Sequence, residues 1–510
     1  CMQSLFASRK FRESRNKSIE SGRAGNTVYT SEWFKWIKER ESTAGDDTTS
    51  IWSIGVDGSQ PFGRKAHSCT LIVLKCEDMD PEGRYLSCNT RLLGIIPGPK
   101  EPKNLNPFLC FIGEEFERLR SSPMEYQYED LDEDGHVVRH SGVHRPILGF
   151  IHADAKAREK IHMCAPGNAI KGCYFCWQRA SEAITRKNGK SYKRRLLTGY
   201  EEEDPVTHIN GITNEEFQLS RCDDDAIQQQ SMIGHADLED ILNIMKTVMP
   251  HGIYDGSSTQ EWQDRLGIHD YAKVFHAVPT LHVKHGIPAP LYHLILLGIT
   301  KNFIKYLWDG HGNKKTSDPD SRSMRVYSKK TVKKLERGIT LNNSFNRPYS
   351  PLEHCYSWIC EEVKVFVEVH SCALFNEEVT GVSVLTPKGM EAWSHLRQFV
   401  MHHLSHAEAG RLEPSQALWH LHQFSRICQE EKAYELLTPN LHTANCLLHH
   451  QEAFLGPLHQ LSELWVERAM RAVSSTSCIN TPEATLAKRY LIRSALEKAK
   501  HKLGPADQSA

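Results

Sequence analysis

The sequence predicts an α/β protein in which a mixed β-sheet flanked by helices is interrupted by a large, mostly α-helical insertion. Three observations predict this class. Short β-branched and apolar runs broken by turns fill residues 51–98, and a helical repeat and a further apolar run follow them. Helical periodicity then dominates residues 178–430 and returns from residue 431.

The elements of the sheet can be placed in order. The runs IWSIGVDGSQPF, SCTLIVLKC and RLLGIIPG predict three strands within residues 51–98. LNPFLCFIGEEFERL (105–119) repeats apolar residues at helical spacing, and PILGFIHAD (146–154) predicts a buried strand that ends on an acid. The expected order is therefore strand, strand, strand, helix, strand.

The rest of the chain divides by composition into four further parts. We expect a lead-in at residues 1–50, with a basic stretch and the helix-like segment SEWFKWIKER, before the first part of the core at 51–177. A helical insertion domain is expected at 178–430, a return of the core at 431–475, and a C-terminal helix and tail at 476–510.

Charge and cysteine usage narrow the class of protein. The 62 Lys and Arg residues nearly cancel the 63 Asp and Glu residues, so a nucleic-acid-binding surface would have to be a local patch. The 15 cysteines are mostly isolated and no secretory apolar region is seen, which indicates a reducing intracellular compartment. No apolar run approaches the ~18 residues that a membrane-spanning helix needs.

Two aspartates stand where strands are predicted to meet. Asp57 lies within the first strand unit and Asp154 at the end of the fourth, so neighbouring strands of one sheet can bring their carboxylates together. Clustered carboxylates bind divalent metal ions. On the pattern alone, an aspartate at a strand end is more often a turn former or a helix cap.

The segment GCYFCW contains the only Cys-x-x-Cys pair of the chain, Cys173 and Cys176. Such a pair supplies half of a tetrahedral zinc site or forms a redox pair. A redox pair is expected to follow a strand and to open a helix in a small βαβ unit, whereas this one follows a polar stretch that contains Pro, Gly and Asn. The context therefore favours zinc.

Several segments occur in the order seen in CACTA (En/Spm-like) transposases, and the sequence resembles that family over most of its length. LLGIIPGPKEP in particular is similar to a characteristic segment of the family; the related Kyakuja-Dileera-Zisupton group is the neighbouring alternative. The other matching segments are DGSQPF, ADAKAR followed by GCYFCW, LYHLILLGITKNF, TPNLH and GPLHQLSELWVER.

The resemblance implies a ribonuclease-H-like catalytic core with a DDE triad, here Asp57, Asp154 and Glu467. The residues around Glu467 agree with that role, because Gly456-Pro457 can begin a helix whose apolar stripe excludes Glu467. The stripe consists of Leu458, Leu461, Trp465 and Ala469. The alternative is a solvated glutamate beside Arg468.

The resemblance also implies a structural zinc ion held by the Cys pair and by two ligands shortly before the catalytic glutamate. The matching place is TPNLHTANCLL, where Thr438 can cap a helix that Pro439 opens, with His442 and Cys446 one turn apart. Cys446 replaces the family's usual histidine, and zinc accepts thiolate and imidazole alike. The implied ligands are Cys173, Cys176, His442 and Cys446. In the alternative, Cys446 is a buried thiol, and His449, His450 or Cys164 completes the site.

What the resemblance implies for function is cut-and-paste DNA transposition, with Mg²⁺ or Mn²⁺ at the triad, DNA and further copies of the chain as partners, and the nucleus as location. Two departures from the family, Pro290 and Lys156, leave the three carboxylates untouched. The alternative is an inactive or domesticated derivative that keeps the zinc-stabilised fold as a DNA- or protein-binding module. Candidate phosphate contacts are Lys100, Lys103, Lys193, Arg194 and Arg195.

Overall fold

The computed structural model describes most of the chain outside one long region. The described residues are 2–6, 8–20, 27–59, 68–79, 89–131, 136–165, 272–309, 324–339, 350–404 and 412–474, with short pieces between 173 and 268 and between 487 and 492. The chain divides into two compact units. Unit 1 comprises Cys1–Ile161, Ala272–Pro290 and Ala453–Ala510, and unit 2 comprises His162–Tyr271 and Leu291–Glu452.

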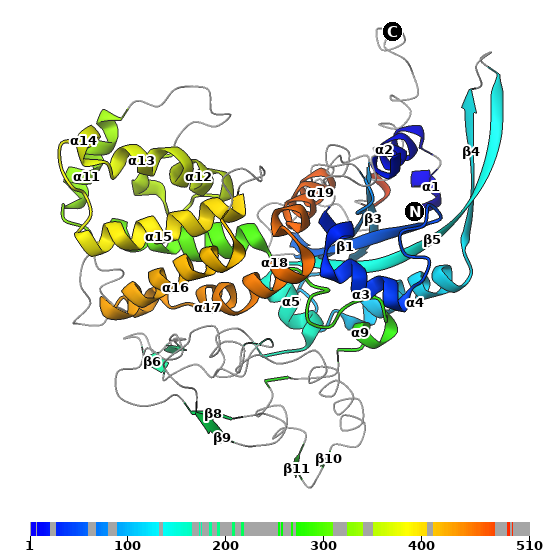
Figure 1. Cartoon of the computed structure of the whole chain (residues 1–510), viewed down its shortest axis with the longest axis horizontal. Coiled ribbons are helices and arrows are strands. Elements are labelled where there is room, and N and C mark those ends of the chain that lie inside the picture. The colour runs from blue at the N-terminus through cyan, green and yellow to red at the C-terminus, as the bar shows by residue number, and fades with distance from the viewer. Residues whose placement is uncertain are drawn as a thin grey trace. The chain divides into compact units, whose positions relative to one another are not determined.

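Unit 1 is built on a five-stranded mixed sheet in the order β3-β2-β1-β5-β4 (Figure 1). The strands are β1 (Thr49–Ser59), β2 (Cys69–Cys76), β3 (Thr90–Ile96), β4 (Met124–Leu131) and β5 (Val137–Ala153). β1, β2 and β3 are successively antiparallel, and β5 runs parallel to β1. The three predicted strands of residues 51–98 are confirmed, as is the α/β class, and α4 (Asn106–Ser121) is the predicted helix.

The last strand is longer than predicted, because β5 has two partners along its length. Its first half pairs with β4 as an antiparallel hairpin, from Leu131 opposite Val137 to Met124 opposite His144. Its second half pairs with β1 and is buried. The hairpin was not predicted because its side of β5 is largely exposed and shows no alternation of apolar and polar residues.

The described helices within residues 1–50 pack against the sheet. They are α1 (Met2–Phe6), α2 (Arg9–Glu20) and α3 (Glu32–Arg40). The guanidinium of Arg12 in α2 donates two hydrogen bonds, of 2.8 and 2.9 Å, to the carboxylate of Asp130 in β4. This paired geometry fixes α2 against the hairpin, so part of the basic stretch has a structural role.

The described part of residues 291–452 in unit 2 is mostly helical, with one isolated β-bridge between Arg325 and Leu385. A stack of aromatic rings joins its helices, with Phe303 parallel to Trp393 at 6.2 Å and edge-on to Phe424 at 5.2 Å. Its main helices are α10 (Lys301–Asp309), α11 (Lys329–Gly338), α12 (Cys360–Val365), α15 (Pro387–Leu404), α16 (Pro414–Glu430) and α17 (Pro439–Thr443). The described pieces between residues 183 and 258 are short antiparallel strand pairs. No described helix is both long and apolar enough to cross a membrane.

The chain passes from one unit to the other four times, at residues 161/162, 271/272, 290/291 and 452/453. The candidate zinc ligands therefore belong to unit 2, with the helices, and the candidate carboxylates belong to unit 1.

Glu336 in α11 gives unit 2 a pH-dependent stability. The side chain is buried, burial raises its pKa to about 7, and the hydrogen bond that it accepts from the backbone N–H of Leu352 opposes this only in part. The pKa is higher in the folded than in the unfolded chain, so the stability from Glu336 is complete below about pH 4.5 and is lost as the pH rises through about 7.

We expect Glu336→Gln to melt at a higher temperature than the wild type at pH 8, and at nearly the same temperature at pH 5, because glutamine keeps the acceptor without the charge. Thermal unfolding at both pH values tests this. The control is Glu361→Gln at an exposed position, which should show no such difference. An equal shift at both pH values would contradict the assignment.

Candidate active site and metal centre

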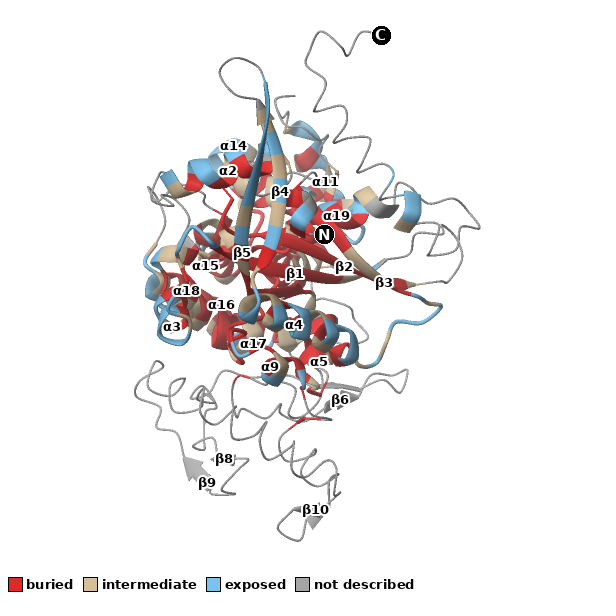
Figure 2. Ribbon diagram, turned by 90° about the vertical axis from the view of Figure 1, so that its right-hand side faces the viewer, coloured by how far each residue is buried: buried red, intermediate tan, exposed pale blue. Residues whose placement is uncertain are grey.

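The two predicted aspartates lie at the same end of neighbouring parallel strands. Val56 of β1 pairs with Ala153, the last residue of β5, so the next residues are Asp57, near the end of β1, and Asp154, directly after β5. Both side chains are partly exposed, whereas the strand residues before them are buried, as Figure 2 shows for the middle of the sheet. The two carboxylates thus lie together at the carboxyl ends of the parallel strands β1 and β5, as the strand pattern predicts.

Asp154 also caps a helix, which was the alternative role predicted for an aspartate at the end of a strand. Its Oδ1 accepts a hydrogen bond of 2.7 Å from the backbone N–H of Ala157, in the first turn of α5 (Ala155–His162). This bond fixes the carboxylate at the end of β5. It uses only one of the two oxygens, so capping and metal binding are compatible.

Glu467 lies on α19 (Leu464–Ser474), which packs on the face of β1 and β2. The buried cluster joins Trp465, Val466, Ala469 and Met470 of the helix to Cys69, Leu71, Val73 and Leu92 of the sheet. Gly55 of β1 permits this approach, since a Cβ there would lie 2.6 Å from Cγ2 of Val466. The helix is therefore seated directly on the strand that carries Asp57.

The orientation of Glu467 agrees with the predicted apolar stripe. Its side chain is 27% exposed, and Oε2 lies 3.7 Å from Nη2 of Arg471 one turn later. The stripe itself is split, because Leu458 and Leu461 belong to a separate 3₁₀ turn (Leu458–Leu461) before α19 begins. All four stripe residues are buried, so Glu467 lies off the packed face.

The three carboxylates do not form one tight ligand group. Among the described residues, two groups of three or more His, Cys, Asp or Glu side chains have ligand atoms within 4.8 Å of one another, and neither group contains Asp57, Asp154 or Glu467. Two metal ions about 4 Å apart bridge a wider set of carboxylates than a single ion does. The triad therefore stays a prediction, for which the structure gives the common sheet edge and the helix seated on β1.

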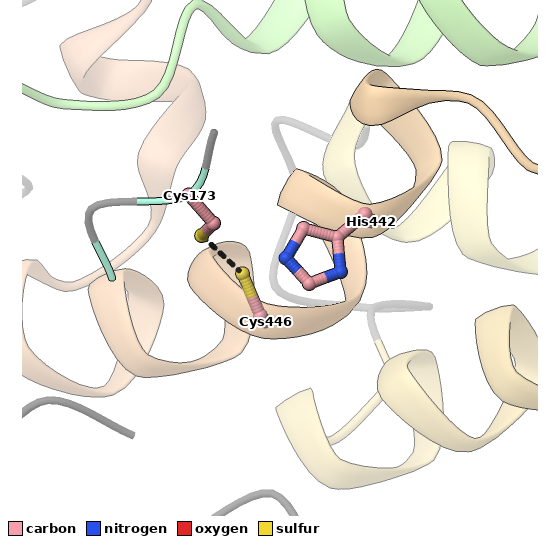
Figure 3. Close-up of side chains that lie close together, drawn as sticks. All are labelled: Cys173, His442 and Cys446. Atoms are coloured by element: carbon pink, nitrogen blue, oxygen red, sulfur yellow. Dashed lines mark hydrogen bonds between the residues drawn. The ribbon is translucent and has the colours of Figure 1, made fainter. Parts of the chain in front are cut away.

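One of the two tight groups contains three of the predicted zinc ligands, Cys173, His442 and Cys446 (Figure 3). Sγ of Cys173 lies 3.5 Å from Sγ of Cys446. A disulfide needs about 2.05 Å between the sulfurs, whereas two thiolates on one tetrahedral zinc ion lie about 3.8 Å apart. The observed spacing is close to that of metal ligands.

The local fold explains how His442 and Cys446 come together. Oγ1 of Thr438 accepts a hydrogen bond of 3.3 Å from the N–H of Leu441, and Pro439 occupies the first turn of α17, as predicted. The helix continues as a π-helical segment (Ala444–Leu448) and then as α18 (His449–Leu455). Widened turns of this kind occur frequently at functional sites.

Several predicted site residues lie outside the described part of the chain. Cys176 is one of them, and so are Arg194, Arg195 and the side chain of Lys193. The alternative ligands Cys164, His449 and His450 are not members of the tight group around Cys446.

The loop after β3 carries Lys100 and Lys103, both exposed, beside the carboxylate edge. A Cβ on Gly58, the residue after Asp57, would lie 2.8 Å from Oε1 of Glu101. Glu101 in turn accepts a hydrogen bond of 2.8 Å from Lys160 of α5, which lowers its pKa. The loop thus reaches the ends of β1 and β5 through Glu101, and Lys100 and Lys103 flank this residue in the sequence.

The second tight group, His402, His403 and Glu452, was not predicted from the sequence. Its only local signal is the adjacent pair of histidines, because the glutamate lies 50 positions after His402.

Comparison of the chain with models of known protein families gives no match, and comparison with curated proteins gives none.

Proposed function

We propose that the chain is a DDE-type DNA transposase that cleaves and transfers phosphodiester bonds with Mg²⁺ or Mn²⁺ held by Asp57, Asp154 and Glu467. The observation that carries the proposal is the placement of Asp57 and Asp154 at the ends of adjacent parallel strands, with the helix of Glu467 seated on one of them. Clustered carboxylates that hold two such ions activate the attacking hydroxyl and stabilise the leaving oxygen.

The sheet supports a ribonuclease-H-like core for unit 1. Three antiparallel strands, a covering helix and a fourth core strand parallel to the first follow one another in the order predicted from the apolar and helical patterns of the sequence. The hairpin of β4 and β5 is an extension at the edge of this arrangement. Such an enzyme acts on DNA in the nucleus, as an assembly of several copies.

The metal centre of unit 2 supports the same proposal. Cys173 follows Asp154 by 19 positions, and Cys446 precedes Glu467 by 21 positions. A zinc ion on Cys173, Cys176, His442 and Cys446 would hold together the two chain segments that lead to the catalytic carboxylates. The runner-up function, a binding module without cleavage, shares this centre and differs only in the chemistry at the sheet edge.

The direct test is cleavage of plasmid DNA by the purified chain. We expect nicking with Mg²⁺ or Mn²⁺ and none with EDTA, and we expect Asp57→Asn to lower the rate at least about 10³-fold, because the amide cannot hold the metal charge. Asp47→Asn, at an exposed position of the same unit, is the matched control and should keep full activity. If Asp57→Asn nicks DNA as fast as the wild type and the control do, Asp57 is not a metal ligand.

DNA binding gives a second test. Neutralising Lys100 and Lys103 together to glutamine should weaken association with duplex DNA, and should reduce the slope of log affinity against log salt by up to about 1.8, for two lost phosphate contacts. The measurement is fluorescence anisotropy over a range of salt concentrations. Lys35→Gln with Lys38→Gln, two exposed lysines of α3, is the control pair. Equal slopes in both double variants would place the loop outside the DNA interface.

A further inference from the structure

Two adjacent histidines at the end of α15 face a buried glutamate of α18. His402 and His403 are 1% and 4% exposed, and Glu452 is 4% exposed. Nε2 of His402 lies 2.9 Å from Oε2 of Glu452, and Nδ1 of His403 lies 3.9 Å from the same oxygen. Three ligand atoms thus converge inside unit 2, within 4.8 Å of one another.

The stereochemistry of the histidine pair favours a common ligand point. Neighbouring residues of an α-helix project about 100° apart, so their side chains normally diverge. Here they converge because His402 uses its distal ring nitrogen and His403 its proximal one. The centroids of the two rings lie 4.7 Å apart, and the ring planes are nearly perpendicular, at 81°. Both nitrogens can therefore bind one ion that also contacts the carboxylate.

The electrostatics of the place favour a cation. A buried carboxylate needs a compensating charge. His402 and His403 lie in the last turn of α15, where the helix dipole stabilises positive charge. Nδ1 of His402 is buried and has no hydrogen-bond partner among the described residues, so this ring is held on the Nε2 side alone.

We propose that His402, His403 and Glu452 bind a divalent metal ion, best matched by zinc, at a site separate from the centre around Cys446. Two imidazoles and one carboxylate are a frequent zinc donor set, whereas Mg²⁺ and Ca²⁺ select oxygen ligands. Donor atoms on one tetrahedral zinc ion lie about 3.3 Å apart. The distances of 2.9 and 3.9 Å bracket this value, so small side-chain shifts admit the ion.

The role of this ion is structural, because all three ligands are buried. It joins the end of α15 to α18 within unit 2. Cys446 and Glu452 are six positions apart on one continuous helical segment, residues 439–455. Two metal ions would therefore hold this segment at two points, one through the sulfur centre and one through the histidine centre.

The test is the metal content of the full chain, expressed with zinc and freed of loosely bound metal. We expect two zinc ions per chain in the wild type and one in Glu452→Gln and in His403→Asn. His395→Ala is the matched control, because His395 and His420 form a close histidine pair, with their Nδ1 atoms 2.8 Å apart, that lies in neither ligand group. This control should retain two ions.

Cobalt keeps the test decisive if a variant folds poorly. Cys446→Ser, which removes the sulfur centre, should still bind one Co²⁺ and show visible d–d absorption without sulfur-to-cobalt charge transfer. A wild type with a single zinc ion, lost completely in Cys446→Ser, would overturn the proposal and leave His402 and Glu452 as a simple ion pair.

Discussion

Glu467→Gln should abolish metal-dependent DNA nicking while the protein keeps its fold and its zinc. Glutamine has nearly the shape of glutamate, and the side chain lies off the face of α19 that packs on the sheet, so the buried cluster of Trp465 and Val466 is untouched. What is lost is the charge that holds a catalytic metal ion. We expect a fall in rate of at least about 10³-fold, measured by plasmid nicking in Mg²⁺ and in Mn²⁺.

Arg471→Ala is the matched control for this variant. It removes the neighbouring cation of Glu467 from the same exposed face of α19 and keeps the carboxylate. It should retain most of the nicking activity and the wild-type melting temperature. Nicking that persisted in Glu467→Gln would show that another acid, with Glu463 nearest in sequence, has the third role.

Cys446→Ser should release one zinc ion and destabilise unit 2 by more than about 4 kcal/mol, the range typical of a lost structural metal. Sγ of Cys446 lies 3.5 Å from Sγ of Cys173, which is 273 positions away in the chain. The substitution therefore removes a link between two segments that are distant in the sequence. Metal analysis and urea unfolding measure the two effects. The exposed thiol of Cys372 offers the control, and Cys372→Ser should change neither quantity.

His449→Ala decides between the two ligand sets. If Cys446→Ser keeps the full zinc content of the wild type and His449→Ala loses one zinc ion, the sulfur centre exists but its fourth ligand was assigned wrongly. If both variants keep the full zinc content of the wild type, Cys446 is a buried thiol that binds no metal.

The sequence was most informative where one side of an element is buried. Alternating or continuous apolar runs identified β1, β2 and β3, and the stripe through Trp465 and Ala469 identified the packed face of α19. Capping chemistry placed the start of α17 at Thr438. These features depend on residues that are close together in the chain, so their pattern can be read from a single sequence.

What escaped prediction depends on partners distant in the chain. The hairpin of β4 and β5 is stabilised by backbone pairing on exposed strands, so its composition carries little signal. The role of Arg12 is set by Asp130, 118 positions later, and Glu452 meets His402 only through the packing of α18. The membership of His442 and Cys446 in one group was implied by family resemblance, and the π-helical segment after Thr443 was not expected at all.

The order in which unit 1 is encoded has a consequence for its synthesis. The sheet strands are complete by Ala153, but α19, which covers Leu71, Val73 and Leu92, begins only at Leu464. A ribosome adding about 5–20 residues per second needs about 15–60 s for the intervening 300 or so residues. During that time this apolar face lacks its own helix, so we expect the nascent chain to be prone to aggregation until α19 has been synthesised.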